Sequence, residues 1–387
     1  MTLTPDQIAI VKSTAPVIKQ HGQAVTSLFY KNLLSSNPGL QNYFSLRNQQ
    51  TGAQQAALAH AVLASATYID DLPKIAAAVE RIAQKHASLF VRPEQYPIVG
   101  EFLIGAFAQV LGEAFTEEVK SAWVAAYGVL ADIFINREKQ LYAEAGDWQD
   151  WRNFTITKKE IESEGVYVSV QIPIPELNGI FQSRQFSLSL APHDGLDHYR
   201  ITVKNEASDQ VSSVEDLAAG KTPGLVAQRL HNNFSVGSEL QLSPPHGEFA
   251  FTPSSSPSST QESISPIVLL SIGSTRPITW VHGARHSGAV CYGKHVRELS
   301  SQHANVTAKI FVKNIQEGDE QGREYDYAGR LSLDKLTEDG TLPLGDASTE
   351  YYICGPEEWM VETRAWLDNK GVSRERQHLE LFRTGMV

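Results

Sequence analysis

The first 147 residues carry apolar side chains at helical spacing. Ile8, Val11, Ala15 and Ile18 recur three or four residues apart, which predicts an apolar stripe along one helix. Residues 4–7 begin this helix with a capping threonine, a proline at the first helical position and a glutamine three residues after the cap.

Further helices are expected after this one. The second contains Phe29 and is bounded by Gly22 and by the Asn37-Pro38 pair; the others are expected at residues 51–69, 74–88, 94–115 and 117–145. Six or seven amphipathic helices without strands predict an all-α domain over residues 1–147.

From residue 154 the pattern changes to the period-two alternation of strands. Strands are expected at residues 154–158, 167–172, 185–190, 199–204 and 239–242, with Pro and Gly turns between them. They predict a small antiparallel β-domain, a barrel, over residues 148–252. Residues 253–266 are rich in Ser and Pro, which is typical of a flexible loop or linker.

From residue 267 strands alternate with helices. Strands are expected at residues 267–270, 278–282, 308–312 and 351–354, and helices at 292–301 and 357–369. This order predicts an α/β nucleotide-binding domain over residues 267–387. Only residues 271–277 separate the first two strands, whereas a crossover between parallel neighbours needs a dozen or more. Either these strands are not parallel neighbours, or a loop and a helix have been lost between them.

Charge and composition narrow the classes of partner and compartment. The net charge of −11 argues against nucleic acids and anionic membranes, which bind basic patches, and favours small molecules. The two cysteines, Cys291 and Cys354, cannot form a disulfide framework and suit a reducing compartment. The N-terminus lacks the features of a signal peptide, and no apolar run is long enough to span a bilayer. A cytoplasmic location is therefore expected.

One histidine lies where a helix could present it to a pocket. His86 is in the last turn of the helix predicted at 74–88, with Ile82 one turn earlier on the same side. A histidine at this position often does no more than stabilise the helix dipole. In the preceding helix Gln54 and Leu58 share a face, whereas His60 points elsewhere and is a poor candidate for the same pocket.

Several motifs in the first 147 residues match one family in order and spacing. They are Phe29-Tyr30, Asn37-Pro38, Phe44, Asn48-Gln49, Gly52, Ile82 to His86, Pro93 to Tyr96, Val99 to Glu101 and the run from Ala126 to Glu138. With these motifs the segment resembles the globin domain of the flavohaemoglobins. The resemblance implies a globin fold that binds haem, with His86 as the proximal ligand of the iron.

The resemblance also implies roles for the residues around the haem. A histidine that ligates iron needs an acceptor on its second ring nitrogen, and the family places a tyrosine and a glutamate there, here Tyr96 and Glu138. On the opposite side Tyr30 and Gln54 would hydrogen-bond bound dioxygen. Without the resemblance, Tyr30 is an ordinary core residue, and Gln54 and Glu138 are surface polar residues.

Three more positions complete the implied haem pocket. Phe44 and Leu58 would wall the pocket and keep water from the iron, although both also suit an ordinary core. Lys85 matches a position that tunes the haem potential, although by itself it is a solvated lysine.

The β-domain resembles the flavin-binding barrel of the ferredoxin reductase family. Residues 184–187 (Arg184, Gln185, Phe186, Ser187) match an Arg-x-Tyr-Ser motif whose Arg and Ser contact the FAD phosphates and ribityl chain. Tyr167 matches the tyrosine of a Gly-Gln-Tyr motif, and Phe382 matches an aromatic residue that covers the flavin. Phe186 replaces the motif's Tyr and Ala227 replaces a phosphate-binding Ser. One strand before Tyr167 has no counterpart, which would leave an unpaired edge.

The last domain resembles the nicotinamide-binding domain of the same family. Cys354, Gly355 and Pro356 match a Cys-Gly-Pro motif that approaches the nicotinamide of NADH or NADPH. The family's glycine-rich loop, which binds the pyrophosphate, and its first crossover helix have no counterpart here. Two in-frame losses in a close match favour a splice variant or an incorrect gene prediction; decay of the reductase half is the alternative.

Resemblance over the whole chain implies a nitric oxide dioxygenase. Electrons from NADH or NADPH would pass through FAD to the haem, where O2 and nitric oxide are converted to nitrate. A second hypothesis is a haem protein that only binds O2 or nitric oxide, with an inactive reductase half or an external reductase as its electron donor. A third is a flavoenzyme that reduces another acceptor. NADH consumption that rises with added nitric oxide would separate the first two hypotheses.

Overall fold

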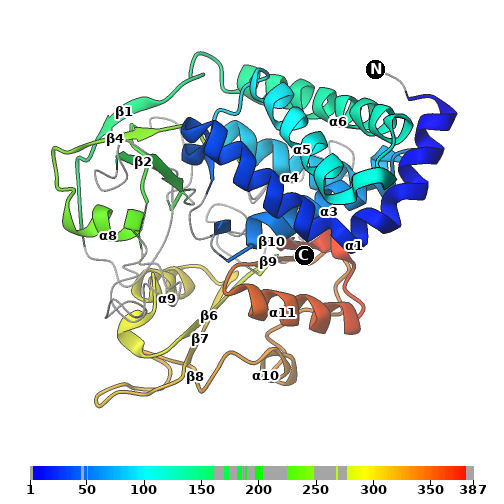
Figure 1. Cartoon of the computed structure of the whole chain (residues 1–387). Helices are drawn as coiled ribbons and strands as arrows, with labels where there is room; N and C mark the ends of the chain where they lie inside the picture. Colours follow the sequence, from blue (N-terminus) through cyan, green and yellow to red (C-terminus); the bar gives the residue numbers. More distant parts are fainter. Residues whose placement is uncertain are drawn as a thin grey trace.

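The computed structural model describes most of the helical domain and parts of the rest. The described residues are 3–44, 48–49, 51–160, 170–173, 181–184, 186, 188–189, 197–201, 203, 225–247, 267–268 and 277–380. Figure 1 shows the helical domain with a small antiparallel sheet beside it; the parallel sheet and its helices lie below, and α11 runs under the helical domain.

The helical domain follows the predicted order of helices, with 3-10 turns between some of them. Its described elements, with η denoting a 3-10 helix, are α1 (Pro5–Ser36), η1 (Pro38–Tyr43), α3 (Ala53–Thr67), η2 (Leu72–Ile75), α4 (Ala76–Ser88), α5 (Gln95–Leu111), η3 (Gly112–Ala114) and α6 (Glu117–Glu144). The predicted capping box is confirmed, because Gln7 N–H donates to the Thr4 hydroxyl and Thr4 N–H donates to the Gln7 side chain.

The predicted break at Gly22 is wrong, because α1 runs without interruption from residue 5 to residue 36. Gly22 faces α3 instead: a Cβ added at this position would lie 3.2 Å from the Cβ of Ala59. One turn later the Thr26 hydroxyl donates to the backbone oxygen of Gln55 at 2.9 Å. The glycine therefore allows α1 and α3 to pack closely, which a sequence pattern cannot distinguish from a helix end.

Helix α5 corrects a second expectation, that no apolar run is long enough to span a bilayer. In the part of the chain that the structure describes, residues 95–114 reach that length and hydropathy. This helix packs against α1 and α6, and buries Leu103, Ala106 and Phe107 in the core of the helical domain. Length and hydropathy alone do not distinguish such a helix from the core helix of a globular domain.

The middle segment contains an antiparallel sheet, as predicted. Its order is β1-β4-β2-β3, and its described elements are β1 (Arg152–Thr155), β2 (Val170–Pro173), β3 (Phe181–Arg184), α8 (Leu225–Asn232) and β4 (Glu239–Leu242). The strand predicted at 239–242 is confirmed. Of the strand predicted at 185–190, the described residues 186, 188 and 189 form no strand, and strand β3 lies before them at 181–184. Residues 199–201 form no strand either. Helix α8 was not predicted. Barrel closure, the missing strand and the linker at 253–266 concern residues outside the described ranges and stay predictions.

The last segment contains a parallel six-stranded sheet in the order β10-β9-β5-β6-β7-β8. Its described elements are β5 (Ile267–Val268), β6 (Ile278–Ala284), η5 (Ser287–Ala289), α9 (Gly293–Gln302), β7 (Val306–Val312), β8 (Tyr327–Ala328), α10 (Leu333–Glu338), β9 (Glu350–Ile353), α11 (Glu357–Asn369), η6 (Arg374–Arg376) and β10 (Gln377–Leu379). The α/β prediction is confirmed, although the short elements β8, α10 and β10 were missed.

Helices cover this sheet on two faces. Val296 of α9 packs on Trp280 and Ile310 at one face. On the other face, Leu336 of α10 packs on Phe311 and Leu367 of α11 packs within the cluster of Tyr351 and Ile353. The alternation of strand side chains between two helical layers is that of a doubly wound nucleotide-binding fold.

The structure decides between the two interpretations of the short connection before β6. Strands β5 and β6 are parallel neighbours, with Ile267 opposite Ile278, so the interpretation that they are not neighbours is wrong. Nine residues, 269–277, lie between the last described residue of β5 and the first residue of β6, which is below the usual length of a crossover. The hypothesis of a lost loop and helix stays a prediction.

Candidate functional site

Three helices bring three predicted residues of the helical domain into direct contact. His86 lies in the last turn of α4, Tyr96 in the first turn of α5 and Glu138 in the interior of α6. Glu138 Oε1 lies 2.8 Å from His86 Nδ1 and accepts the Tyr96 hydroxyl hydrogen bond at 2.5 Å; His86 Nδ1 also lies 3.1 Å from the Tyr96 hydroxyl. Residues up to 52 positions apart thus form one closed hydrogen-bonded triangle.

Burial of Glu138 makes its hydrogen bonds to His86 and Tyr96 important for stability. Glu138 is 1% exposed, so the interpretation of it as a surface polar residue is wrong. A buried carboxylate is costly unless it is hydrogen-bonded, and its Oε1 accepts both available donors, whereas Oε2 has no partner among the described residues. Burial, and next the negative charge of Glu138, raise the pKa of the Tyr96 hydroxyl, which therefore stays a donor.

The triangle leaves the other ring nitrogen of His86 available. Nδ1 is engaged by Glu138, and Nε2 makes no hydrogen bond to any residue that the structure describes. The side chain of His86 is still 31% exposed, and its ring lies 5.6 Å from that of Phe134. An imidazole whose Nδ1–H is held by a carboxylate, with Nε2 unprotonated, is the form that binds a metal ion.

Tyr30 and Gln54 form a second polar pair in the same domain. Tyr30 of α1 is buried, and Gln54 of α3 hydrogen-bonds its hydroxyl. Burial raises the pKa of Tyr30, and the hydrogen bond of Gln54 opposes this shift only in part. Phe44 packs edge-on against Tyr30 with ring centroids 5.3 Å apart, and Leu58 packs against the same cluster. His60 is exposed, as its position on the helix predicted.

The two groups lie in two hydrophobic clusters, and Tyr127 packs against both of them. Tyr30, Phe44 and Leu58 belong to a cluster centred on α1 and α5, whereas Tyr96 and Phe134 belong to a second one between α4 and α6. A protein interior is normally filled to near crystal density. The ring of His86, with Nδ1 held and Nε2 without a partner among the described residues, would supply one ligand to a flat apolar group bordered by the apolar side chains of these clusters. The side chains present therefore fit a haem.

Two further residues support Tyr96, and the sequence analysis assigned them no role. The Tyr127 hydroxyl donates to the backbone oxygen of Tyr96 at 2.6 Å. Its ring passes over Gly100, where an added Cβ would lie 2.5 Å from Tyr127 Cε1. Both positions fall within the motifs that carry the family resemblance, so the sequence did mark them as notable. Their contact could not be predicted, because a hydrogen bond from a side chain to the backbone of another helix produces no periodic pattern in the sequence.

Lys85 is partly buried and precedes the ligand position, and its backbone oxygen accepts the Ser88 hydroxyl at 2.8 Å. The side chain of Lys85 is therefore not fully exposed to solvent, contrary to the expectation of a solvated lysine.

Most of the predicted flavin residues lie outside the described ranges. These are Tyr167, Gln185, Ser187 and Phe382. Arg184 ends β3, where it pairs with Val170. Phe186 packs against a cluster that contains Val226 and Leu240, so its ring contributes to the core of the β-domain.

The predicted nicotinamide motif lies at the edge of the parallel sheet where ligands bind in this fold. The strand order reverses between β5 and β9, and Cys354 directly follows β9 at its carboxyl end. Cys354 is exposed. Gly355 lies beneath the ring of Trp359, where an added Cβ would come within 2.7 Å, so only glycine fits without movement.

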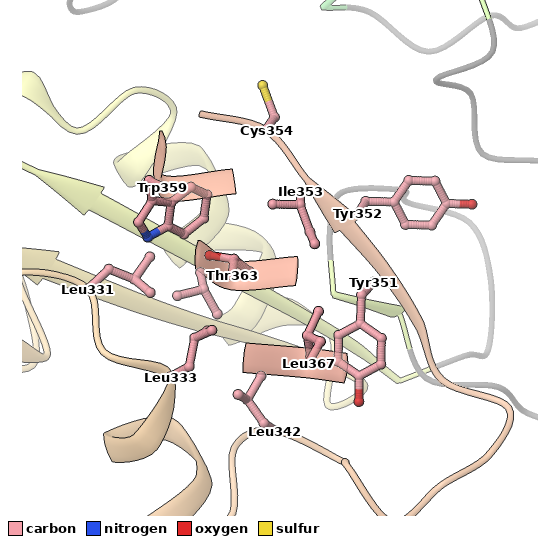
Figure 2. Close-up of a pocket in the computed structure, with 11 residues that line it drawn as sticks. Leu331, Leu333, Leu342, Tyr351, Tyr352, Ile353, Cys354, Trp359, Thr363 and Leu367 are labelled. Carbon is pink, nitrogen blue, oxygen red and sulfur yellow. The ribbon is translucent and has the colours of Figure 1, made fainter. Parts of the chain in front are cut away.

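An apolar cavity of about 70 Å³ lies behind this motif (Figure 2). Leu331, Leu333 and Leu367 converge on it, whereas the side chains of Tyr352 and Cys354 point away. Strand alternation explains this difference. Cys354 lies just beyond the end of β9 at the border of the cavity, and its thiol points away from the cavity's leucines.

Comparisons with known proteins agree with this architecture. The globin family model matches residues 27–134, and the model of the oxidoreductase NAD-binding domain matches residues 265–365. A crystal structure of flavohemoglobin from Malassezia yamatoensis with bound FAD and heme has a TM-score of 0.76 at 23% identity, and covers 98% of this chain and 99% of that chain. At this identity the similarity shows the fold alone.

Two relatives carry the comparison further. A flavohemoprotein from Deinococcus radiodurans is 37% identical over 98% of this chain and 97% of its own length. A flavohemoprotein from Bordetella pertussis is 39% identical over 100% of both chains. That alignment has 427 positions for a chain of 387 residues, so about 40 positions of the relative have no counterpart here. At these identities over the whole length, the chain belongs to the flavohemoprotein family.

Proposed function

We propose that this protein is a nitric oxide dioxygenase that uses electrons from NADH or NADPH, with haem held by His86 and FAD held by the β-domain. One observation carries the proposal: Glu138 Oε1 lies within hydrogen-bond distance of both His86 Nδ1 and the Tyr96 hydroxyl. Family membership supports the same assignment.

The bound cofactors supply the redox chemistry: haem iron provides the site where O2 and nitric oxide react, and FAD passes it electrons from the nicotinamide. The protein supplies orientation and charge. The Glu138 carboxylate accepts the Nδ1–H of His86, which fixes the ring and its tautomer. The partial negative charge transferred to the imidazole makes Nε2 a stronger donor to the iron. Tyr96 holds Glu138 in place and cannot release its own proton near neutral pH.

On the opposite side of the proposed pocket, the Tyr30 hydroxyl would be available to donate a hydrogen bond to an oxygen ligand. Its hydroxyl stays protonated because burial raises its pKa, and Gln54 holds its orientation. Phe44 and Leu58 exclude water, which slows unproductive oxidation. Lys85, one residue before the proposed iron ligand His86, adds a positive charge that would tune the haem potential.

The flavin and nicotinamide roles rest on the family resemblance. Arg184 and Ser187 would hold the FAD phosphates and ribityl chain, while Tyr167, Gln185, Phe186 and Phe382 would line the flavin. Cys354, Gly355 and Pro356 would approach the nicotinamide, and their position at the reversal of strand order supports this role.

A second candidate function is a haem protein that binds O2 or nitric oxide while its reductase half is inactive or replaced by an external reductase. The nine-residue connection between β5 and β6 favours it, because the family places its pyrophosphate-binding loop and a helix there. The positions without counterpart in the Bordetella alignment agree with such a loss.

Sequencing the transcript tests the splicing explanation, which fails if the full-length message lacks both segments and no longer form exists.

An absorption spectrum of the purified protein, before and after NADH is added without oxygen, separates the two functions. The proposed dioxygenase shows haem and flavin bands, NADH reduces the haem, and nitric oxide then accelerates NADH consumption in air. Haem bands that NADH and NADPH leave unchanged, but dithionite reduces, would establish the second function. Absence of haem bands after reconstitution with hemin would contradict both.

A further inference from the structure

The helix of the proposed haem ligand is contacted by the reductase half on both sides of His86. The first contact lies two residues before it. The backbone N–H of Gly247, in the segment that follows β4, donates to the side-chain Oε1 of Gln84 at 3.0 Å. This bond joins residues 163 positions apart and connects the helical domain to the β-domain.

The side chain of Gln84 is held so that its oxygen faces the reductase half. Its Nε2 donates to Glu80 Oε1 at 2.9 Å, one turn earlier on α4. Glu80 is in turn fixed by Arg137 of α6, whose Nε and Nη2 bind the two carboxylate oxygens at 2.6 and 2.8 Å. A bidentate pair of this kind has defined geometry. The acceptor for Gly247 is therefore preorganised by two helices of the helical domain.

The same arginine extends the contact toward the next residue of the reductase segment. Arg137 Nη1 also binds Glu144 Oε1 at 3.0 Å. His246 lies near Glu144, and its Nε2 is buried without a partner among the described residues. Residues 246 and 247 thus both face the network that Arg137 organises.

The second contact lies just after the end of α4. The helix ends in a Schellman motif: Phe90 N–H donates to Ala87 O, and Val91 N–H donates to His86 O, both at 3.0 Å. The residue in the left-handed position is usually glycine, but here it is Phe90, with φ of 56°. For a bulky residue this conformation is unfavourable and requires compensation from packing.

The compensation comes partly from the start of the reductase half. The ring of Phe90 meets that of Trp151 edge-on at 5.4 Å and stacks on Tyr142 at 6.1 Å. Arg92 covers Phe90 and donates to the backbone oxygen of Gln149 at 2.7 Å. Trp151 directly precedes β1, so this cluster anchors the first strand of the β-domain to the end of α4.

We propose that the reductase half clamps α4 at two points on either side of His86, and that Gln84 and Phe90 are positioning residues of this clamp. The inference rests on the proposed role of His86 as the haem ligand. A helix held at residue 84 and at residue 90 transmits a displacement of either contact to His86. The backbone oxygen of His86 is itself a bonding partner of the second contact, through Val91. Docking of the reductase half thereby sets the orientation of the ligand.

Amide hydrogen exchange of the full-length protein tests the clamp in Gln84→Ala, Trp151→Ala and the double variant. Loss of one hydrogen bond is expected to speed exchange at residue 247 about fivefold in Gln84→Ala. Each single variant is expected to speed exchange in the peptide that contains His86, and the double variant to exceed the product of the two effects. Gln20→Ala, at an exposed position of α1, is the matched control and should change none of these peptides.

The clamp is overturned if residue 247 exchanges at the wild-type rate in Gln84→Ala, or if the effects at the His86 peptide are independent. Trp151→Phe replaces Trp151→Ala if the latter does not fold. In hemin-reconstituted protein, the iron–histidine stretching band should shift in the double variant and stay in place in Gln20→Ala; an unshifted band contradicts the positioning role. Exchange is also measured without hemin, so that the clamp is tested whether or not the protein binds haem. A protein that binds no haem would contradict the proposed function alone.

Discussion

The helical half and the nucleotide-binding half present their candidate residues in opposite ways. In the helical half His86, Tyr96 and Glu138 come from three helices and meet in one hydrogen-bonded triangle. In the nucleotide-binding half Cys354, Gly355 and Pro356 are consecutive in sequence, and Cys354 is exposed at the end of β9. One site depends on the packing of a whole domain, and the other on a single strand end.

This difference determines what each half can tolerate. A site assembled by packing is destroyed by loss of any helix, and its buried carboxylate would be costly without its partners. A strand end persists when a neighbouring loop is shortened: β5 and β6 remain parallel neighbours although only nine residues join them. A convergent site is therefore stronger evidence for a working function than a contiguous motif.

The largest expected effect comes from replacing the residue at the centre of the convergent site. His86→Ala removes the proposed iron ligand, and should lower haem retention and nitric oxide consumption by more than about 100-fold, because even loss of a residue that only supports a ligand costs up to that factor. The measurement is the absorption spectrum and nitric oxide consumption after reconstitution with hemin. His60→Ala, on the exposed face of α3, is the control and should behave as wild type. A normal haem spectrum in His86→Ala would mean that the convergent site of the helical half does not hold the haem.

The next largest effect tests the triangle itself. Glu138→Gln keeps the shape but removes the charge that holds His86 Nδ1 and the Tyr96 hydroxyl, so haem affinity or turnover should fall about 10- to 100-fold. Competition with apomyoglobin for hemin measures the affinity. Glu118→Gln, exposed on the same helix, should have no effect. Equal behaviour of the two variants would mean that the buried carboxylate has only a structural role.

The sequence predicted the helical half well because its signals are local and repeated. The capping box at Thr4 and the apolar period placed the helices, and the family motifs brought His86 and Glu138 together. Gly22 was misinterpreted because a glycine at a helix crossing and a glycine at a helix end look the same in sequence. The apolar run of α5 was overlooked, although its length and hydropathy reach those of a membrane-spanning helix.

The reductase half was predicted less accurately because its elements are short. The missed strands β8 and β10 have two and three residues, too few for a periodic pattern. Strand β3, at residues 181–184, lies before the strand expected at 185–190. Contacts between domains, such as Gly247 with Gln84, join positions that no local pattern connects. Such contacts depend on how folded domains dock, which sequence spacing does not encode.

A glycine substitution shows how tightly the convergent site depends on packing. Gly100→Ala forces Tyr127 away from Tyr96, and overpacking of this kind should lower the free energy of unfolding by about 1–3 kcal/mol. Gly105 lies on the same helix with open space around its Cβ position, so Gly105→Ala should instead stabilise the protein by up to about 1 kcal/mol. Chemical denaturation of both variants provides the measurement. Equal effects would show that Tyr127 does not constrain α5.

Alkaline pH should reveal the buried tyrosine of the triangle. The pKa of Tyr96 is raised by burial and then by Glu138, so above about pH 10 the unfolded chain loses this proton while the folded protein keeps it. Stability is therefore complete below pH 10 and falls as pH rises further, with Tyr96 contributing up to about 1.4 kcal/mol per pH unit. Tyr96→Phe should lose stability less steeply with pH in denaturation experiments between pH 9 and 11. Parallel slopes for the two proteins would contradict the burial of this hydroxyl.

The smallest effect concerns the contiguous site and leaves the fold intact. Although Cys354 is exposed, desolvation by its surroundings, and then the Glu380 carboxylate, raise the pKa of its thiol to about 11. Because the thiolate is the nucleophile, iodoacetamide should modify Cys354 at least about tenfold more slowly at pH 8 than an unperturbed thiol, and the rate should rise steadily toward pH 10. Mass spectrometry locates the label, and Cys354→Ser shows whether the buried Cys291 contributes. Rapid labelling at pH 8 would mean that the thiol pKa is not raised and that the strand end lacks the packed surroundings that a nicotinamide site needs.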